Sequence, residues 1–283
     1  MDKNTKLLLT VIGTILCISL ISGSIVLMMD SKEKWPPDDI YVYDTRGYMA
    51  YETGEDISID ILLCSLHRTG KNPMAKYQNV YFETDMGVRY QSDLTGEIKR
   101  QLFDEDEIIS QSIIRFPLNG DFVPGNTLNF TKMILQKDDG LETVREFGKI
   151  EIELLQPSEI NEKAVIDIPV AISERLAEFE YSVENRSKNV MIVQELYLGN
   201  DIKYKAAPVT VPSLSIQKNQ VDFMGTEGFG DFPEYIVIKP KFKILDEQGQ
   251  EYICTATGRT AYSGSTTNAV LREYLWQYVN GEK

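Results

Sequence analysis

The chain begins with an apolar run, residues 7–29, in which no side chain is charged. As an α-helix with a rise of about 1.5 Å per residue, this run reaches roughly 34 Å, which is enough to cross a bilayer core of about 30 Å. Lys3 and Lys6 precede the run, and such positive flanks stay on the cytoplasmic side. Trp35 follows at the depth where an indole ring meets lipid headgroups. The run therefore predicts a single-pass signal-anchor with its N-terminus in the cytoplasm and the bulk of the chain outside.

Two other interpretations of this run stay open. A cleaved signal peptide has an apolar region of about 7–15 residues before a small-residue cleavage site. Residues 22–24 supply small side chains, but residues 25–29 continue the apolar run beyond them. A lipoprotein would carry lipid on Cys17, where the preceding Leu16 is bulkier than such a signal uses. We favour the uncut anchor and expect Cys17 to face the bilayer as an apolar side chain.

Charge and cysteine content limit the function classes. The chain has a net charge of −14, and residues 1–29 carry +1, so the remainder carries −15. Such an acidic chain repels phosphate backbones, which disfavours nucleic-acid binding. Cys64 and Cys254 each lie in an apolar, strand-like stretch. We expect both to be buried free thiols, because free cysteine is most often a core residue.

Apolar and polar residues alternate with a period of two through most of the exported part, for example at residues 57–63, 178–184 and 235–245. This alternation predicts half-buried antiparallel strands, with Ser58 and Asp60 on a polar face. Glycine-containing turns recur at intervals of about 8–15 residues, which is typical of a sandwich. Pro240 cannot donate to a ladder and predicts an edge strand or a bulge.

The polar segment 155–162 separates two strand-rich halves, and each half closes with a similar hairpin, at residues 135–150 and 245–254. We interpret this as a weak tandem repeat. The predicted organisation is a cytoplasmic N-terminus (1–6), a transmembrane helix (7–29), a juxtamembrane linker (30–38), a first β-sandwich (39–156), a linker (157–163), a second β-sandwich (164–264) and a C-terminal amphipathic helix (265–283).

Two segments resemble parts of bacterial immunoglobulin-like domains. Residues 179–187 followed by 190–192 resemble their strand–corner–strand, and residues 121–130 resemble their Pro-Gly turn and following strand. The resemblance implies an all-β fold of two tandem antiparallel immunoglobulin-like sandwiches. It also implies a role in binding or spacing, and it transfers no functional residue.

The C-terminal segment predicts a helix. Residues 265–268 supply N-cap side chains, and an apolar stripe follows at Leu271, Tyr274, Leu275, Tyr278 and Val279. The helix either packs on the second sandwich or is offered to a partner's groove. Because aromatic side chains favour interface anchors, Tyr274, Trp276 and Tyr278 are the candidate partner-binding residues.

The sequence contains no catalytic signature. His67 is the single histidine, at the end of an apolar strand, and Cys64 falls on the opposite strand face. Zinc sites need about four ligands at set spacings, which this pattern lacks. Carboxylates are plentiful, with the densest group at residues 104–107, expected as a solvated loop before a strand at 108–116. Calcium binding there or at residues 138–139 stays an alternative, and no metal or cofactor is expected.

These observations favour a non-enzymatic, membrane-anchored extracytoplasmic scaffold that engages a protein partner in a membrane or cell-envelope complex. One alternative is a glycan- or calcium-binding surface module. Another is a carboxylate-dependent hydrolase, which would require a cleft with two facing carboxyl groups.

Overall fold

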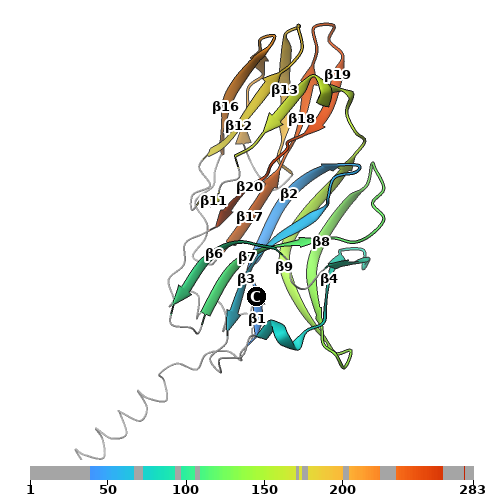
Figure 1. Ribbon diagram of the computed structural model, residues 1–283, viewed down its shortest axis with the longest axis vertical. Helices are drawn as coiled ribbons and strands as arrows, with labels where there is room; N and C mark the ends of the chain where they lie inside the picture. Colours follow the sequence, from blue (N-terminus) through green and yellow to red (C-terminus); the bar gives the residue numbers. More distant parts are fainter. Residues whose placement is uncertain are drawn as a thin grey trace, which may run out of the picture. The chain divides into compact units, whose positions relative to one another are not determined.

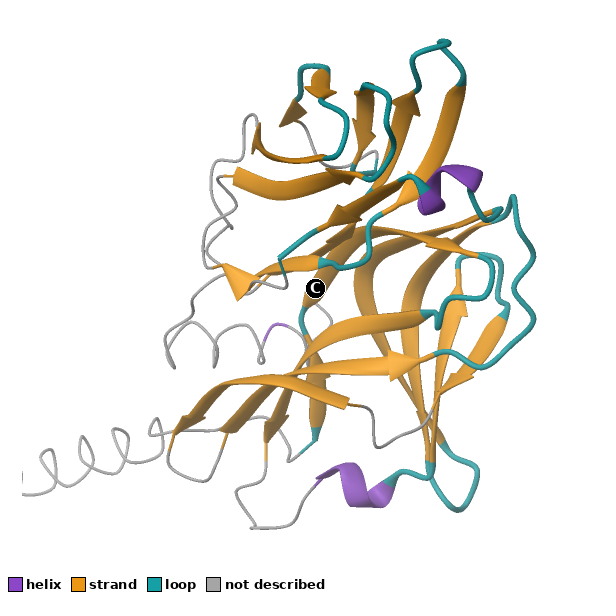
Figure 2. Cartoon of the chain, turned by 45° about the horizontal axis from the view of Figure 1, so that its top comes forward, coloured by secondary structure: helices purple, strands orange, loops and turns teal. Residues whose placement is uncertain are grey.

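The computed structural model describes residues 39–66, 73–92, 97–105, 109–169, 172–173, 178–199, 204–223, 234–263 and Gln277. Apart from Gln277, these residues all belong to one compact unit, Asp38–Tyr274. Figure 2 shows that this part of the chain is built of strands, with short 3-10 turns at η1 (Pro73–Lys76) and η2 (Glu159–Glu162). The predicted all-β class is confirmed.

The first half of the chain, residues 39–156, contains an antiparallel four-stranded sheet, here called sheet A. Its strands in spatial order are β1 (Ile40–Val42), β3 (Ser58–Leu66), β7 (Ile109–Pro117) and β6 (Glu97–Glu105). Strand β6 pairs Asp104 with Ser110 and Glu105 with Ile109. The expected loop at 104–107 is therefore wrong for these two acidic residues, because β7 supplies them with a ladder partner.

The second half, residues 164–264, contains two antiparallel four-stranded sheets. Sheet C has the order β10 (Ala164–Asp167), β12 (Glu178–Asn185), β16 (Ser215–Phe223) and β14 (Tyr204–Lys205). Sheet D has the order β15 (Val209–Val211), β13 (Met191–Tyr197), β18 (Lys241–Leu245) and β19 (Glu251–Thr255). Their apolar faces share one core, in which the rings of Tyr181 and Phe242 lie 5.1 Å apart. Because β12 and β13 belong to different sheets, the predicted strand–corner–strand is confirmed.

One further sheet contains strands from both halves of the chain (Figure 1). The order in this eight-stranded sheet B is β11 (Ile172–Ser173), β20 (Thr260–Ser263), β17 (Glu234–Lys239), β2 (Asp44–Glu52), β9 (Glu142–Leu155), β8 (Thr127–Gln136), β4 (Asn79–Thr84) and β5 (Arg89–Ser92). Strand β17 pairs in parallel with β2, from Glu234 opposite Asp44 to Lys239 opposite Met49. The pairs β2–β9 and β11–β20 are also parallel. Sheet B is therefore mixed, which corrects the expectation of purely antiparallel sandwiches; the domain boundaries themselves stay a prediction.

Pro240 lies between β17 and β18. Strand β17 has a partner on each side, β20 and β2, so the predicted edge strand is wrong. The chain instead leaves sheet B at Pro240 and enters sheet D at Lys241. Since proline lacks an N–H, it fits the point where one ladder ends and another begins.

Strand β3 differs from its predicted half-buried state. Eight of its nine residues are buried, including the polar Ser58 and Asp60. The reason is a side chain from the second half, Arg259, which covers both of them. Period-two alternation thus predicted the strand correctly but did not predict the burial of its polar face.

The two predicted hairpins are present, as β8–β9 and β18–β19. Their turns contain Gly140 and Gly249 at φ 80° and 75°, where a side chain would be strained. Cys64 and Cys254 are free and buried, as expected, and burial raises the pKa of each thiol to about 12.

Several predicted features lie outside the described residues: the run 7–29, His67 and the C-terminal segment apart from Gln277, which is helical. Within the described part, no helix has the length and apolar character needed to cross a membrane.

Candidate functional site

The two halves meet where β2 and β17 run side by side, and a glycine permits this approach. A Cβ on Gly47 would lie 2.1 Å from the carbonyl oxygen of Val237 and 2.7 Å from its Cγ1. These distances are far below van der Waals contact, and one of the atoms belongs to the backbone. The parallel ladder therefore depends on the missing side chain at Gly47.

Beside this ladder, a buried carboxylate is held by two guanidinium groups. Asp60 is 4% exposed, and its Oδ2 lies 2.9 Å from Nε of Arg259. Arg115 donates from Nε to Oδ1 at 2.9 Å and from Nη2 to Oδ2 at 3.1 Å. Because a buried charge is costly unless paired, this arrangement compensates the desolvation of Asp60.

The remaining N–H groups of Arg259 bind other atoms of the first half. Nη1 donates to the Tyr51 hydroxyl at 2.7 Å and to the Ser58 carbonyl at 3.1 Å, while Nη2 donates to Ser58 Oγ at 2.8 Å. Burial raises the pKa of Tyr51, whose hydroxyl stays protonated and donates to the Ser58 carbonyl. One side chain of the second half thus satisfies several polar groups of the first.

Lys239 makes a second buried connection from β17. Its Nζ donates to Glu55 Oε2 at 2.6 Å and to the Ala50 carbonyl at 2.9 Å. The ammonium lies 4.5 Å from the centroid of the Tyr51 ring, a cation–π distance. Burial lowers the pKa of Lys239, and the charge of Glu55 opposes this change only in part.

Lys241, just beyond Pro240, makes the third connection. Its Nζ donates to both carboxylate oxygens of Glu153, at 2.6 and 2.7 Å. The Tyr48 hydroxyl donates to Glu153 Oε2 at 2.5 Å, and burial together with this hydrogen bond raises the pKa of Tyr48. Lys241 also lies 4.7 Å from the centroid of the Tyr197 ring.

In these contacts the opposite charges are divided between the two halves in the same way. The first half supplies the carboxylates, and the second half supplies most of the cations. We call the set the ionic junction: Glu55, Asp60, Arg115, Glu153, Lys239, Lys241 and Arg259. A further carboxylate, Glu52, accepts hydrogen bonds from the Thr255 backbone N–H at 3.4 Å and from Asn161 Nδ2 at 2.6 Å. Together with Glu52, the junction therefore connects both halves and the segment between them.

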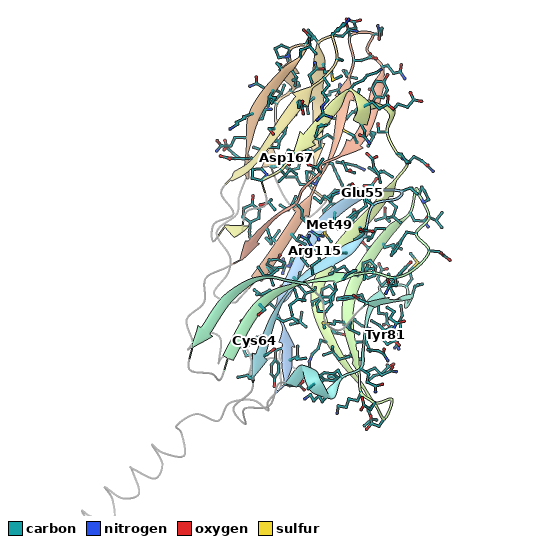
Figure 3. The ribbon with its side chains drawn as sticks, in the orientation of Figure 1. Met49, Glu55, Cys64, Tyr81, Arg115 and Asp167 are labelled. Carbon is teal, nitrogen blue, oxygen red and sulfur yellow. The ribbon has the colours of Figure 1, made fainter. Side chains whose placement is uncertain are left out.

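A pocket of about 1050 Å³ opens beside the ionic junction and is lined by both halves. Its walls include Glu55, Arg115, Phe122, Lys239 and Arg259, and Figure 3 labels Glu55 and Arg115 in this region. Its lining carboxylates are Glu55 and Asp56, which come from one turn rather than from opposite walls. Glu55 is also paired with Lys239. This is not the pair of facing carboxyl groups that a carboxylate-dependent hydrolase would need.

The ionic junction was missed by sequence reasoning. Two signals pointed to it: Ser58 and Asp60 inside an apolar strand, and two lysines flanking Pro240. The predicted partner-binding residues Tyr274, Trp276 and Tyr278, and the membrane-interface residues Lys3, Lys6 and Trp35, all lie outside the described part. Among the described residues, no group of three His, Cys, Asp or Glu side chains is placed to hold a metal ion.

Fold and junction together define an all-β protein of several sheets, with two halves joined by a shared sheet. No protein-family model matches the chain, and no curated protein matches its sequence significantly. Solved structures that match include the YadV chaperone (12% identity, 77% of this chain and 98% of that chain, TM-score 0.22). The periplasmic chaperone SfaE also matches (13%, 79% and 98%, TM-score 0.20). So do fibronectin(III)-like modules of Clostridium thermocellum CbhA (9%, 80% and 94%, TM-score 0.20). At such TM-scores, these similarities carry no argument about function.

Proposed function

We propose that this protein is a non-enzymatic, membrane-anchored scaffold that works outside the cytoplasm and binds a protein partner in a membrane or cell-envelope complex. The observation that carries the proposal is the ionic junction. Its charges are paired with one another across the two halves, and Asp60, Lys239 and Arg259 are buried, so these pairs hold the halves together. Such a connection favours a rigid body, which loses little conformational entropy when it binds.

The anchor and the aromatic C-terminal segment complete the proposal. An uncut helix at residues 7–29 would tether the rigid body to the cell membrane, facing outward. Tyr274, Trp276 and Tyr278 would supply the partner contact, since aromatic side chains are frequent interface anchors.

The test is affinity purification of the full chain from detergent-solubilised membranes. A variant with Tyr274, Trp276 and Tyr278 changed to Ala is expected to lose the partner while its melting temperature stays unchanged. The matched control changes exposed Met86, Leu141 and Val144 to Ala and should keep the partner. A partner retained by the aromatic variant would overturn the assignment of these residues, and a large drop in melting temperature would show that the helix belongs to the core.

The pocket favours one second candidate, a glycan-binding module. Phe122 lines the pocket and stacks on Tyr90, with ring centroids 5.1 Å apart and planes 11° apart. A flat aromatic surface beside polar groups suits a sugar ring. A glycan array would test this, and Phe122→Ala should abolish any signal that depends on the pocket.

A further inference from the structure

One end of the second half exposes apolar side chains on two connected loops and at the start of strand β16. The corner 186–190 joins β12 to β13, and the turn 212–214 precedes β16 at the same end (Figure 1). Here Leu214 is 70% exposed, Ile216 is 66% exposed and Val190 is 45% exposed. We call these three residues, with Lys188 and Lys218, the loop-end surface. Exposed apolar groups that lie close together mark interaction sites more often than isolated ones do.

The backbone of Leu214 is strained. Its φ is 51°, and it is the one non-glycine residue with positive φ in the described part of the chain. A left-handed conformation is unfavourable for leucine, whereas glycine or asparagine tolerates it. Both the backbone conformation of Leu214 and the exposure of its side chain to water therefore raise the free energy of the folded state. Strain of this kind concentrates at functional positions.

A buried asparagine holds the loops in place. Asn185 is 1% exposed, and its Nδ2 donates to the carbonyls of Asn189 at 2.7 Å, Val211 at 3.1 Å and Pro212 at 3.1 Å. The Leu214 N–H donates to the Ser187 carbonyl at 3.1 Å, which joins the turn to the corner. The loop-end surface is thus fixed before any ligand arrives, and preorganisation lowers the entropy lost on binding.

Two exposed cations, Lys188 and Lys218, lie beside the apolar Val190 and Ile216. Glu184 is paired with Arg186 at 2.8 Å, and Glu247, which accepts from the neutral Asn189 Nδ2 at 2.6 Å, keeps its negative charge. Lys188 and Lys218 are exposed, and among the described residues neither ammonium group has a hydrogen bond or an ion pair. A ligand for this surface would therefore combine an apolar centre with carboxylates.

We propose that the loop-end surface binds an acidic protein segment, with Leu214 and Ile216 in the apolar contact and Lys188 and Lys218 facing carboxylates of the partner. This inference rests on the proposed function of a protein-binding scaffold, and it names a second contact surface and the chemistry of its ligand.

The test is photo-cross-linking of the full chain in the membranes of its native cell. A benzophenone amino acid replaces Ile216 in one variant and Leu141 in the control, which is 61% exposed on the β8–β9 turn of the first half. We expect a protein adduct at position 216 and none at 141. The cross-linked peptide, sequenced by mass spectrometry, should contain Asp or Glu next to the attachment point. Lys188→Glu with Lys218→Glu should lower the adduct yield at least tenfold, whereas Lys137→Glu should not.

Leu214→Asn separates a binding role from a structural one. Asparagine tolerates positive φ, so the melting temperature should stay equal or rise, while the adduct at position 216 falls several-fold. A clear drop in melting temperature would show that Leu214 stabilises the fold instead.

The other outcomes overturn the inference. These are a basic or purely apolar cross-linked peptide, a lipid adduct, a second copy of this chain, or a yield unaffected by charge reversal. If position 216 gives no adduct while the aromatic variant still loses its partner in the pull-down, the proposed scaffold function is retained and binding at the loop-end surface is rejected. If the pull-down also finds no partner, both fail.

Discussion

Arg259 of the second half lies 2.9 Å from the carboxylate of Asp60 in strand β3 of the first half, and both side chains are buried. The same guanidinium binds Tyr51 and Ser58. Asp60 is thereby shielded from water by a residue whose position in the sequence is almost at the end of the described chain.

Arg259→Ala should destabilise the protein strongly, because it leaves Asp60 buried with one of its two cations missing and exposes unpaired polar groups. Breaking a buried pair costs about 3–5 kcal/mol, and we expect the lower end since Arg115 remains. Chemical denaturation measures the loss. Arg186→Ala removes an arginine from an exposed pair with Glu184 and should leave the midpoint unchanged. Equal effects of the two changes would contradict the role of Arg259.

Glu55→Gln should cost more stability than Lys239→Met. Lys239 is the buried partner, with 6% side-chain exposure against 36% for Glu55, so removing Glu55 leaves a cation buried without its anion. Methionine keeps much of the lysine volume and leaves Glu55 able to meet water. Denaturant midpoints of both variants and of the double variant give the comparison.

The same pair predicts a pH dependence. Burial lowers the pKa of Lys239 below 10.5, so the unfolded chain binds more protons just below that pH. Stability linked to Lys239 therefore rises with pH in this window. Glu55→Gln should lower this pKa further, so the variant's deficit relative to wild type should shrink as pH approaches 10.5. A deficit that stays constant with pH would contradict the assignment.

Gly47→Ala should loosen the parallel pairing of β2 with β17, because its Cβ would meet the Val237 carbonyl oxygen at 2.1 Å. Forcing atoms into such a contact costs about 1–3 kcal/mol. Hydrogen exchange should accelerate at amides 234–239. Gly87→Ala is the control: no atom lies within 4 Å, and its φ of 79° makes the change locally strained in the turn between β4 and β5, at the opposite side of sheet B from β17. Faster exchange in β17 of the control would argue against a specific effect.

Cys64 and Cys254 should be unreactive toward a thiol reagent in the native protein at pH 8 and reactive after unfolding, in a Cys17→Ser background. Burial raises each pKa from 9.0 to about 12. The folded state therefore keeps its thiol protons longer than the unfolded one, and the linked stability is present below pH 9 and lost as pH rises through about 12. Replacing both by Ala should flatten the decline in stability above pH 9.

Local patterns predicted the strands well and their partners poorly. Alternation located β12 and β18, and the turn glycines located both hairpins, because these features are set within a few residues. The parallel pairing of β2 with β17 joins segments far apart in the chain, which no local period encodes.

The candidate site shows the same limit. The alternation predicted that Asp60 and Ser58 lie on a solvent-exposed strand face. No residue near them in the sequence indicates that Arg259 covers them. Pro240 predicted an edge strand or a bulge, whereas its position where the chain passes from sheet B to sheet D could be recognised only with both sheets known. Polar residues inside an apolar strand were the available sign of the ionic junction.

We propose that the shared sheet and the ionic junction make the two halves one rigid body that serves as a binding scaffold. Differential scanning calorimetry of the full chain in detergent measures whether the halves unfold together. We expect a single transition for the two halves, with equal calorimetric and van't Hoff enthalpies, that separates into two transitions when Arg259 and Lys239 are both changed to Ala. Two independent transitions in the wild-type protein would contradict it.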